Sequence, residues 1–146
     1  MIEFVKRTGL MIGDENGNFR PDVPLTRGEM AVIAARLKQL ASPVPEQSSF
    51  VDVAASHWAS PAIEAAHRAQ IVDGYPDGTY KPNGQLTRAE AVAIVNRLLN
   101  RGPLYGVFSP HWPDVPASHW AYGQIEEASE NHDYTARLEG GESIVD

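Results

Sequence analysis

The sequence contains no cysteine in its 146 residues, so disulfide bridges and thiolate sites for metals or redox groups are excluded. No apolar run approaches the roughly 20 residues that a membrane-spanning helix requires. Basic residues are scarce, with 12 Lys and Arg against 19 Asp and Glu, and the net charge of −7 argues against nucleic acid as a partner. Apolar residues, by contrast, make up 42% of the chain, which is enough for a packed core.

The sequence repeats itself at an interval of about 61 residues. Segment 2–40 aligns with segment 63–101, and the shared residues include Leu-Thr-Arg in both. A second alignment places segment 52–59 on segment 114–121, where both contain Ser-His-Trp-Ala. Because spacing and identity agree in the two alignments, we interpret the chain as an array of repeated units.

The array consists of one complete unit between two partial ones. Residues 50–101 form the complete unit. Residues 1–40 are the back half of a preceding unit, and residues 112–146 are the front half of a following unit with a degenerate C-terminal end. We expect the chain to belong to a longer protein, with any export signal upstream of residue 1.

Each unit is predicted to be a helix, an ordered loop and a second helix. In the complete unit, Ser60 caps the first helix and Gly74 ends it in the left-handed conformation. Segment 75–79, Tyr-Pro-Asp-Gly-Thr, has the residues of a tight turn. The second helix begins at a capping box, Thr-Arg-Ala-Glu at 87–90, in which the Thr and Glu side chains bind each other's backbone amides. The preceding unit repeats this at 26–29.

The second helices carry apolar residues at helical spacing. The expected buried positions are Met30, Ile33, Ala34 and Leu37 in one unit and Ala91, Ile94, Val95 and Leu98 in the next. Neither helix can bury its stripe alone, so the units must pack on one another. The sequence therefore predicts an all-α bundle with short extended connections.

Arg27 and Arg88 are the residues of the capping boxes that helix energetics does not explain. Each occupies the first helical position, where the positive end of the helix dipole disfavours a cation. A guanidinium group beside the free amides of a helix N-terminus would make an anion-binding site. The alternative is a salt bridge to a carboxylate of a neighbouring unit, and the sequence leaves both open.

Trp58 and Trp120 follow His57 and His119 in the repeated Ser-His-Trp-Ala motif. A Trp at the mouth of a small helical unit is commonly a packing anchor, whereas a half-exposed indole could stack on the apolar face of a sugar. The two histidines are expected to be hydrogen-bonded turn residues, because no second metal ligand lies at a suitable spacing.

The sequence lacks the common catalytic and metal-binding motifs. Segment 14–18 offers oxygens at alternate positions, but Phe19 and Leu25 replace the Gly and the closing Glu that a calcium loop needs. There is no H-E-x-x-H, G-x-S-x-G or Walker sequence, and nothing pairs a nucleophile with a base. We predict a non-enzymatic protein without metal or cofactor.

The ordered pattern F-x-D-V…S-H-W-A…I-E…G-Y-P-D-G-T-Y-x-P…L-T-R-A-E resembles the S-layer homology repeat. It runs through residues 50–100, with partial copies in 2–40 and 112–129. The matching positions of the complete unit are Phe50, Asp52, Val53, His57, Trp58, Ala59, Ile63, Gly74, Pro76, Asp77, Gly78, Tyr80, Pro82, Leu86, Thr87, Arg88 and Glu90.

This resemblance implies a secreted module of the bacterial cell wall. Three such units usually form a pseudo-threefold bundle, whose grooves hold an acidic secondary cell-wall polysaccharide attached to peptidoglycan, commonly one capped by a pyruvylated sugar. An Arg of the T-R-A-E motif would hold the carboxylate, and a groove Trp would stack on the sugar. The residues that we assign to ligand binding on this basis are Arg27, Arg88, Trp58, Trp120, Gly13, Gly74, Glu29, Glu90, Asp52 and Asp114.

The chain departs from the family pattern in three places. The third unit has no T-R-A-E after segment 131–134, so it lacks an Arg of its own at that position. Gly28 stands where Ala is usual, which weakens the first helical turn by up to about 1 kcal/mol. Segment 14–16, Asp-Glu-Asn, makes the first loop more acidic than Tyr-Pro-Asp at 75–77.

The rival hypothesis is a self-assembly module that builds a surface layer or filament. Partial units leave apolar stripes that need cover, and other chains could supply it. The surroundings of Arg27 and Arg88 discriminate the two hypotheses. Exposed guanidinium groups favour the glycan, and guanidinium groups buried against carboxylates of a partner favour assembly.

Overall fold

The computed structural model describes residues 2–129, 131–138 and 140–145. It is a mixed structure in which helices hold about 30% of the chain and three short strands form one sheet. The expectation of an all-α fold is therefore wrong. The chain divides into an N-terminal unit, 1–86, and a C-terminal unit, 87–146.

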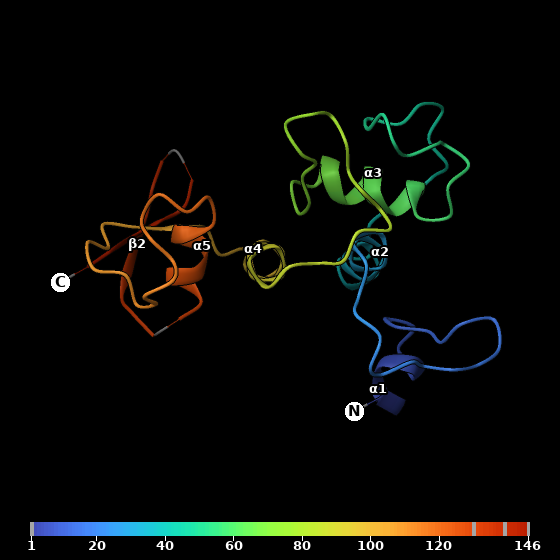
Figure 1. Ribbon diagram of the computed structural model, residues 1–146, viewed down its shortest axis with the longest axis horizontal. Coiled ribbons are helices and arrows are strands. Elements are labelled where there is room, and N and C mark those ends of the chain that lie inside the picture. Colours follow the sequence, from blue (N-terminus) through green and yellow to red (C-terminus); the bar gives the residue numbers. More distant parts are fainter. Residues whose placement is uncertain (1, 130, 139, 146) are drawn as a thin grey trace. The chain divides into compact units, whose positions relative to one another are not determined.

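The N-terminal unit contains three helices: α1 (Ile2–Arg7), α2 (Arg27–Leu37) and α3 (Ser60–Arg68). Helices α2 and α3 pack against each other. Their contact is made largely of alanine, and the core residues with no exposed surface are Ala31, Ala34, Ala59, Ile63 and Ala66. Small side chains allow the two helices to approach closely. The long loop after α3 then runs back to the N-terminus of α2 (Figure 1).

The sequence repeat is also a repeat of backbone conformation. Residues with positive φ occur in pairs 61 positions apart: Gly9 with Gln70, Gly17 with Gly78, Arg20 with Lys81, and Gln39 with Asn100. Two of these pairs follow the C-terminal ends of helices, where a left-handed residue ends the hydrogen-bonded ladder. The predicted capping boxes are confirmed at both helices that begin with T-R-x-E.

Two local predictions for α3 are wrong. The helix begins at Ser60 itself, with Ala59 as its cap, and the Ser60 hydroxyl is buried without a hydrogen-bond partner among the described residues. The left-handed residue after the helix is Gln70, not Gly74. The chain thus turns four residues earlier than a glycine-based argument places it.

The predicted apolar stripes are confirmed in part, since Met30, Ala34, Ile94 and Leu98 are buried. Leu37 and Val95 are exposed, whereas the buried alanines include Ala35 in α2 and Ala93 in α4 (Arg88–Leu98). The alanine side gives closer contact between neighbouring helices than a side of branched residues. The prediction missed these alanines because it ranked residues by hydrophobicity, and it missed the exposure of Leu37 and Val95 for the same reason.

The C-terminal unit combines α4 and α5 (Tyr122–Glu127) with a three-stranded sheet. Helix α4 packs against α5. The sheet has the order β1 (Leu104–Tyr105), β3 (Glu142–Ile144), β2 (Tyr134–Ala136), in which β3 pairs parallel to β1 and antiparallel to β2.

Strands β2 and β3 stand where the complete unit has its loop. Segment 131–145 has no capping box, and its aromatic and β-branched residues favour strands. Gly140 and Gly141 have φ values of 88° and 82°, a conformation that suits a tight connection between β2 and β3.

Candidate functional site

Arg27 is buried at the start of α2, with only 6% of its surface exposed. Its Nε donates to the carbonyl of Tyr80 and its Nη2 to the carbonyl of Asp73, both at 2.7 Å. The guanidinium carbon lies 4.7 Å from the ring centre of Tyr75 and 4.6 Å from that of Tyr80. The guanidinium group is therefore held by backbone carbonyls and aromatic rings of its own chain.

The backbone around Arg27 binds the same loop. The amides of Arg27 and Gly28 donate to the carbonyls of Gly84 and Pro82 at 2.9 and 2.8 Å. A Cβ atom at Gly28 would lie 2.9 Å from the Pro82 carbonyl oxygen, so the absence of a side chain allows this close contact. The α2 N-terminus is thus occupied by protein carbonyls.

Asp52 binds the loop from its other side. Its two carboxylate oxygens accept hydrogen bonds from the amides of Tyr80 and Lys81, both at 2.7 Å. Four groups hold the loop: the guanidinium group of Arg27, the backbone amides of Arg27 and Gly28, and the carboxylate of Asp52. We call these four groups the loop clamp. The loop clamp makes six hydrogen bonds to segment 73–84.

Arg88 and Asp114 occupy the corresponding positions of the C-terminal unit, but they hold nothing. Both side chains are exposed, and neither has a hydrogen bond, ion pair or ring contact to the residues that the structure describes. The amides of Arg88 and Ala89 likewise have no acceptor within the described part of the chain. In the described part of the C-terminal unit, no loop is therefore bound at Arg88, Ala89 or Asp114, and strands β2 and β3 stand where the complete unit has that loop.

The two repeated tryptophans are exposed to solvent. Trp58 is 60% exposed and Trp120 is 65% exposed, so neither is a buried packing anchor. The ring of each lies beside the preceding histidine, at 5.6 and 5.9 Å between ring centres. The prediction that the histidines are turn residues is confirmed, since Nδ1 of His57 and of His119 accepts the amide two residues later.

Gly13 and Gly74 close equivalent loops. A Cβ atom at Gly13 would lie 2.8 Å from the Asn18 carbonyl oxygen, and one at Gly74 would lie 2.7 Å from that of Thr79. The residue after each glycine donates its amide to the same carbonyl. Gly13 is required by the close approach of the loop backbone to itself, and Gly74 by that approach together with the Phe50 ring, which packs against it.

Glu29 and Glu90 complete the capping boxes of α2 and α4. Oε2 of Glu29 accepts the amide of Thr26 at 2.8 Å, and Oε2 of Glu90 accepts the amide of Thr87 at 2.9 Å. These contacts fix the helix N-termini and hence the position of Arg27 and Arg88.

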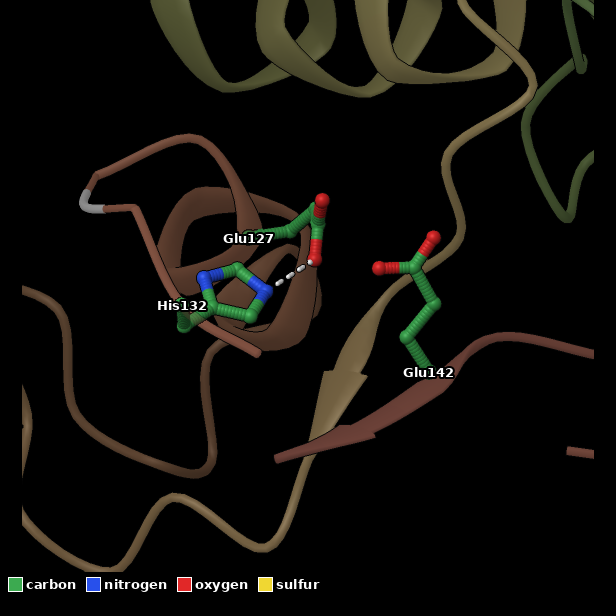
Figure 2. Close-up of side chains that lie close together, drawn as sticks. All are labelled: Glu127, His132 and Glu142. Carbon is green, nitrogen blue, oxygen red and sulfur yellow. Dashed lines mark hydrogen bonds and ion pairs between the residues drawn. The ribbon is translucent and has the colours of Figure 1, made fainter. Parts of the chain in front are cut away.

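A buried polar cluster in the C-terminal unit has no counterpart in the sequence analysis. Glu127 at the end of α5, His132 and Glu142 on β3 place one ligand-type atom each within 4.8 Å of the others (Figure 2). Nε2 of His132 lies 3.0 Å from Oε2 of Glu127. Arg101 forms an ion pair with Glu127 and bonds Glu142 through Nε at 3.2 Å.

This cluster ties the sheet to α5. Burial raises the pKa of the Glu127 carboxyl above its usual range, and the hydrogen bond and charge of Glu142 act in the same direction, whereas Arg101 and His132 lower it. The guanidinium group of Arg101 already supplies a positive charge to both carboxylates. Their irregular spacing in the sequence gives no motif, so only the folded chain brings them together.

Among the described residues, no helix is long and apolar enough to cross a membrane.

Comparison with known proteins connects these features to surface proteins of bacteria. The profile of the S-layer homology domain matches residues 2–31 and 49–92. Cell surface glycoprotein 1 of Acetivibrio thermocellus is 35% identical over 142 residues, which cover 91% of this chain and 6% of that protein. The cellulosome-anchoring protein of the same organism is 34% identical over 149 residues, which cover 99% of this chain and 33% of that protein.

The surface layer protein of Brevibacillus choshinensis is 33% identical over 117 residues, which cover 77% of this chain and 10% of that protein. The chain thus spans a third or less of the length of these relatives. The matched residues contain both T-R-x-E motifs and the complete loop clamp.

Proposed function

This chain belongs to the S-layer homology domain family, and we propose that it anchors a protein to the bacterial cell wall by non-covalent binding of an acidic wall polysaccharide. Its location is the cell-wall surface, as for its relatives. The proposed ligand is a secondary polysaccharide attached to peptidoglycan and capped by a pyruvylated sugar. No catalytic step is involved.

The observation that carries the proposal is the unoccupied N-terminus of α4. It offers the amides of Arg88 and Ala89 and an exposed guanidinium group at one place. A helix N-terminus with an adjacent Arg favours a carboxylate, such as that of a pyruvyl group. Since the protein carries a net charge of −7, its overall field repels an acidic glycan, and binding has to come from such local contacts.

The exposed tryptophans supply the second kind of contact that a sugar requires. Trp58 and Trp120 present more than half of their surface to solvent. We propose that each indole stacks on the apolar face of a sugar ring near its own unit. Two separate contacts on one polymer would add avidity.

The other predicted ligand residues are proposed to act by positioning. Arg27 and Asp52 hold segment 73–84, and Gly13 and Gly74 shape the two loops. Glu29 and Glu90 cap the helices. In this proposal Arg88 binds the anion, and the carboxylate of Asp114 accepts a hydrogen bond from a hydroxyl group of the sugar.

The test is co-sedimentation with purified wall sacculi before and after their secondary polysaccharide is stripped. We expect binding to be lost on stripping and to weaken about tenfold or more in Arg88→Ala, which removes a charge-assisted contact. Arg7→Ala is the matched control, since it removes an exposed Arg from α1. If the amount of protein that sediments with the sacculi changes neither on stripping nor in Arg88→Ala, the proposal is ruled out.

A further inference from the structure

Three side chains of the C-terminal unit form a set of metal-ligand groups that the proposed wall binding does not use. Glu127 lies at the end of α5, His132 in the segment after it, and Glu142 on β3 (Figure 2). Their side chains are only 1%, 8% and 6% exposed, respectively. Two carboxylates buried side by side repel each other, so the cluster requires a cation.

Arg101 supplies a cation to this cluster. Its guanidinium group pairs with Oε1 of Glu127 and donates to both oxygens of Glu142, from Nε at 3.2 Å and from Nη2 at 3.3 Å. The Arg101 side chain is nevertheless 37% exposed, far more than the groups that it contacts. Because a partly exposed guanidinium group is readily solvated, Arg101 can release the two carboxylates to a cation that binds them more strongly.

The geometry of Glu127 and His132 suits such a cation. Oε2 of Glu127 lies 3.0 Å from Nε2 of His132, and the oxygen that pairs with Arg101 is the other one, Oε1. A cation placed among three ligand atoms within 4.8 Å of one another would lie no more than about 2.8 Å from each. Small rotations of the side chains would shorten these distances to the roughly 2.0–2.2 Å of zinc bonds to nitrogen and oxygen.

The chemistry of the three ligands selects a transition-metal dication. Two carboxylates neutralise its charge, and an imidazole nitrogen disfavours Mg²⁺ and Ca²⁺, which prefer oxygen ligands. Three protein ligands leave the fourth position of a tetrahedral ion to water. A cavity of about 400 Å³, whose lining includes His132, Ser129, Asn131 and Tyr134, gives room for that water and an entry path for the ion.

We propose that Glu127, His132 and Glu142 bind one transition-metal dication such as Zn²⁺. The ion displaces the guanidinium group of Arg101 from the two carboxylates. It joins α5, the segment after α5 and β3, so it stabilises the C-terminal unit, because the ligands come together only in the folded chain. The site does not include Arg88, so the inference is independent of the proposed wall binding.

Isothermal titration calorimetry of the untagged full chain with Zn²⁺, at fixed pH after treatment with EDTA, tests the site. We expect one ion per chain with a Kd of about 100 μM or tighter. Glu127→Gln and His132→Gln should each weaken binding about tenfold or more, because each removes one ligand and keeps a polar side chain. The control is His111→Ala, which removes an exposed histidine of the same unit outside the cluster and should leave the affinity unchanged.

Arg101→Ala distinguishes a metal site from a cluster of ion pairs alone. Removing the competing positive charge should tighten Zn²⁺ binding about fivefold or more. The same substitution should make the metal-free chain easier to unfold in denaturant, because the buried carboxylates lose their counter-ion. If Arg101→Ala binds Zn²⁺ no more tightly than the parent chain, the ion does not displace the guanidinium group and the proposal is wrong.

Hydrogen exchange on the parent chain locates the ion without any substitution. Zn²⁺ should slow exchange in α5 and in the sheet, and EDTA should reverse the effect. The proposal is overturned if the Kd for Zn²⁺ is weaker than about 100 μM, if either Gln variant binds the ion as tightly as the parent, or if only the N-terminal unit is protected. Because Arg88→Ala should leave Zn²⁺ binding unchanged, this proposal and that of wall binding can fail separately.

Discussion

Arg27 and Arg88 occupy the same position of the repeat, yet their guanidinium groups have different surroundings. Arg27 is enclosed by two carbonyls and two tyrosine rings, and it links α2 to the loop after α3. Arg88 has the same helix and the same capping box but no loop to bind. The difference lies in the partner, since the local sequence around both residues is nearly identical.

At the residue scale, we expect Arg27→Ala to lower the free energy of unfolding by about 3 kcal/mol, because it leaves buried carbonyl groups without their donor. Arg88→Ala should change it by less than about 0.5 kcal/mol, as expected for an exposed side chain. Chemical denaturation of the two variants measures both values. Equal effects would show that Arg27 does not support the fold in the way that its contacts indicate.

At the element scale, α2 and α4 begin with the same capping box but differ at the second helical residue. Gly28 in α2 allows the Pro82 carbonyl to approach, and Ala89 in α4 has no such neighbour among the described residues. A glycine in a first turn is costly for a helix in isolation. Here that cost accompanies a hydrogen bond of 2.8 Å from the Gly28 amide to the loop.

Helix propensity by itself predicts that Gly28→Ala stabilises the chain by about 1 kcal/mol. We expect the opposite sign, a loss of about 1 kcal/mol or more, because the added Cβ would lie 2.9 Å from the Pro82 oxygen and push the loop away. Thermal or chemical unfolding measures the difference. The matched substitution Ala89→Gly should follow propensity and destabilise the chain by up to about 1 kcal/mol. A stabilised Gly28→Ala variant would contradict the proposed tight contact.

At the scale of the whole molecule, the two units contain carboxyl groups that are perturbed in opposite directions. In the N-terminal unit, the Thr79 hydroxyl and amide lower the pKa of Asp77, and the Asn18 amide lowers the pKa of Asp14. In the C-terminal unit, burial raises the pKa of Glu127. The units should therefore respond differently to acid.

A carboxyl group with a lowered pKa adds stability above its unfolded pKa, near 3.9 for Asp, and loses it as the pH falls through the folded value. A carboxyl group with a raised pKa adds stability below its unfolded pKa, near 4.3 for Glu, and loses it as the pH rises through the folded value. We therefore expect acidification from neutral pH toward pH 4 to protect the C-terminal unit through Glu127. Acidification below about pH 4 should weaken the N-terminal loops.

Hydrogen exchange followed by mass spectrometry, corrected for the intrinsic pH dependence of exchange, reads out each unit separately. Glu127→Gln should flatten the response of the C-terminal unit and leave that of the N-terminal unit unchanged. If hydrogen exchange in the C-terminal unit of the variant depends on pH as strongly as in the parent protein, Glu127 is not the cause of that dependence.

The sequence alone determined the features that depend on neighbouring residues. The capping boxes at α2 and α4 follow from side chains three positions apart, and the paired loops follow from the repeated glycines. The repeat and the family pattern were readable for the same reason. Such local interactions are complete within a few residues, so the order of residues specifies them.

Tertiary structure decided the features that depend on distant partners. Arg27 is buried because a loop 46 to 57 residues later reaches it, whereas Arg88 is exposed because segment 131–145 pairs as strands and supplies no loop. The sheet and the cluster around Glu127 likewise join residues from separate elements. Whether a T-R-x-E motif binds a loop depends on a segment that lies far away in the sequence, so the motif by itself does not determine it.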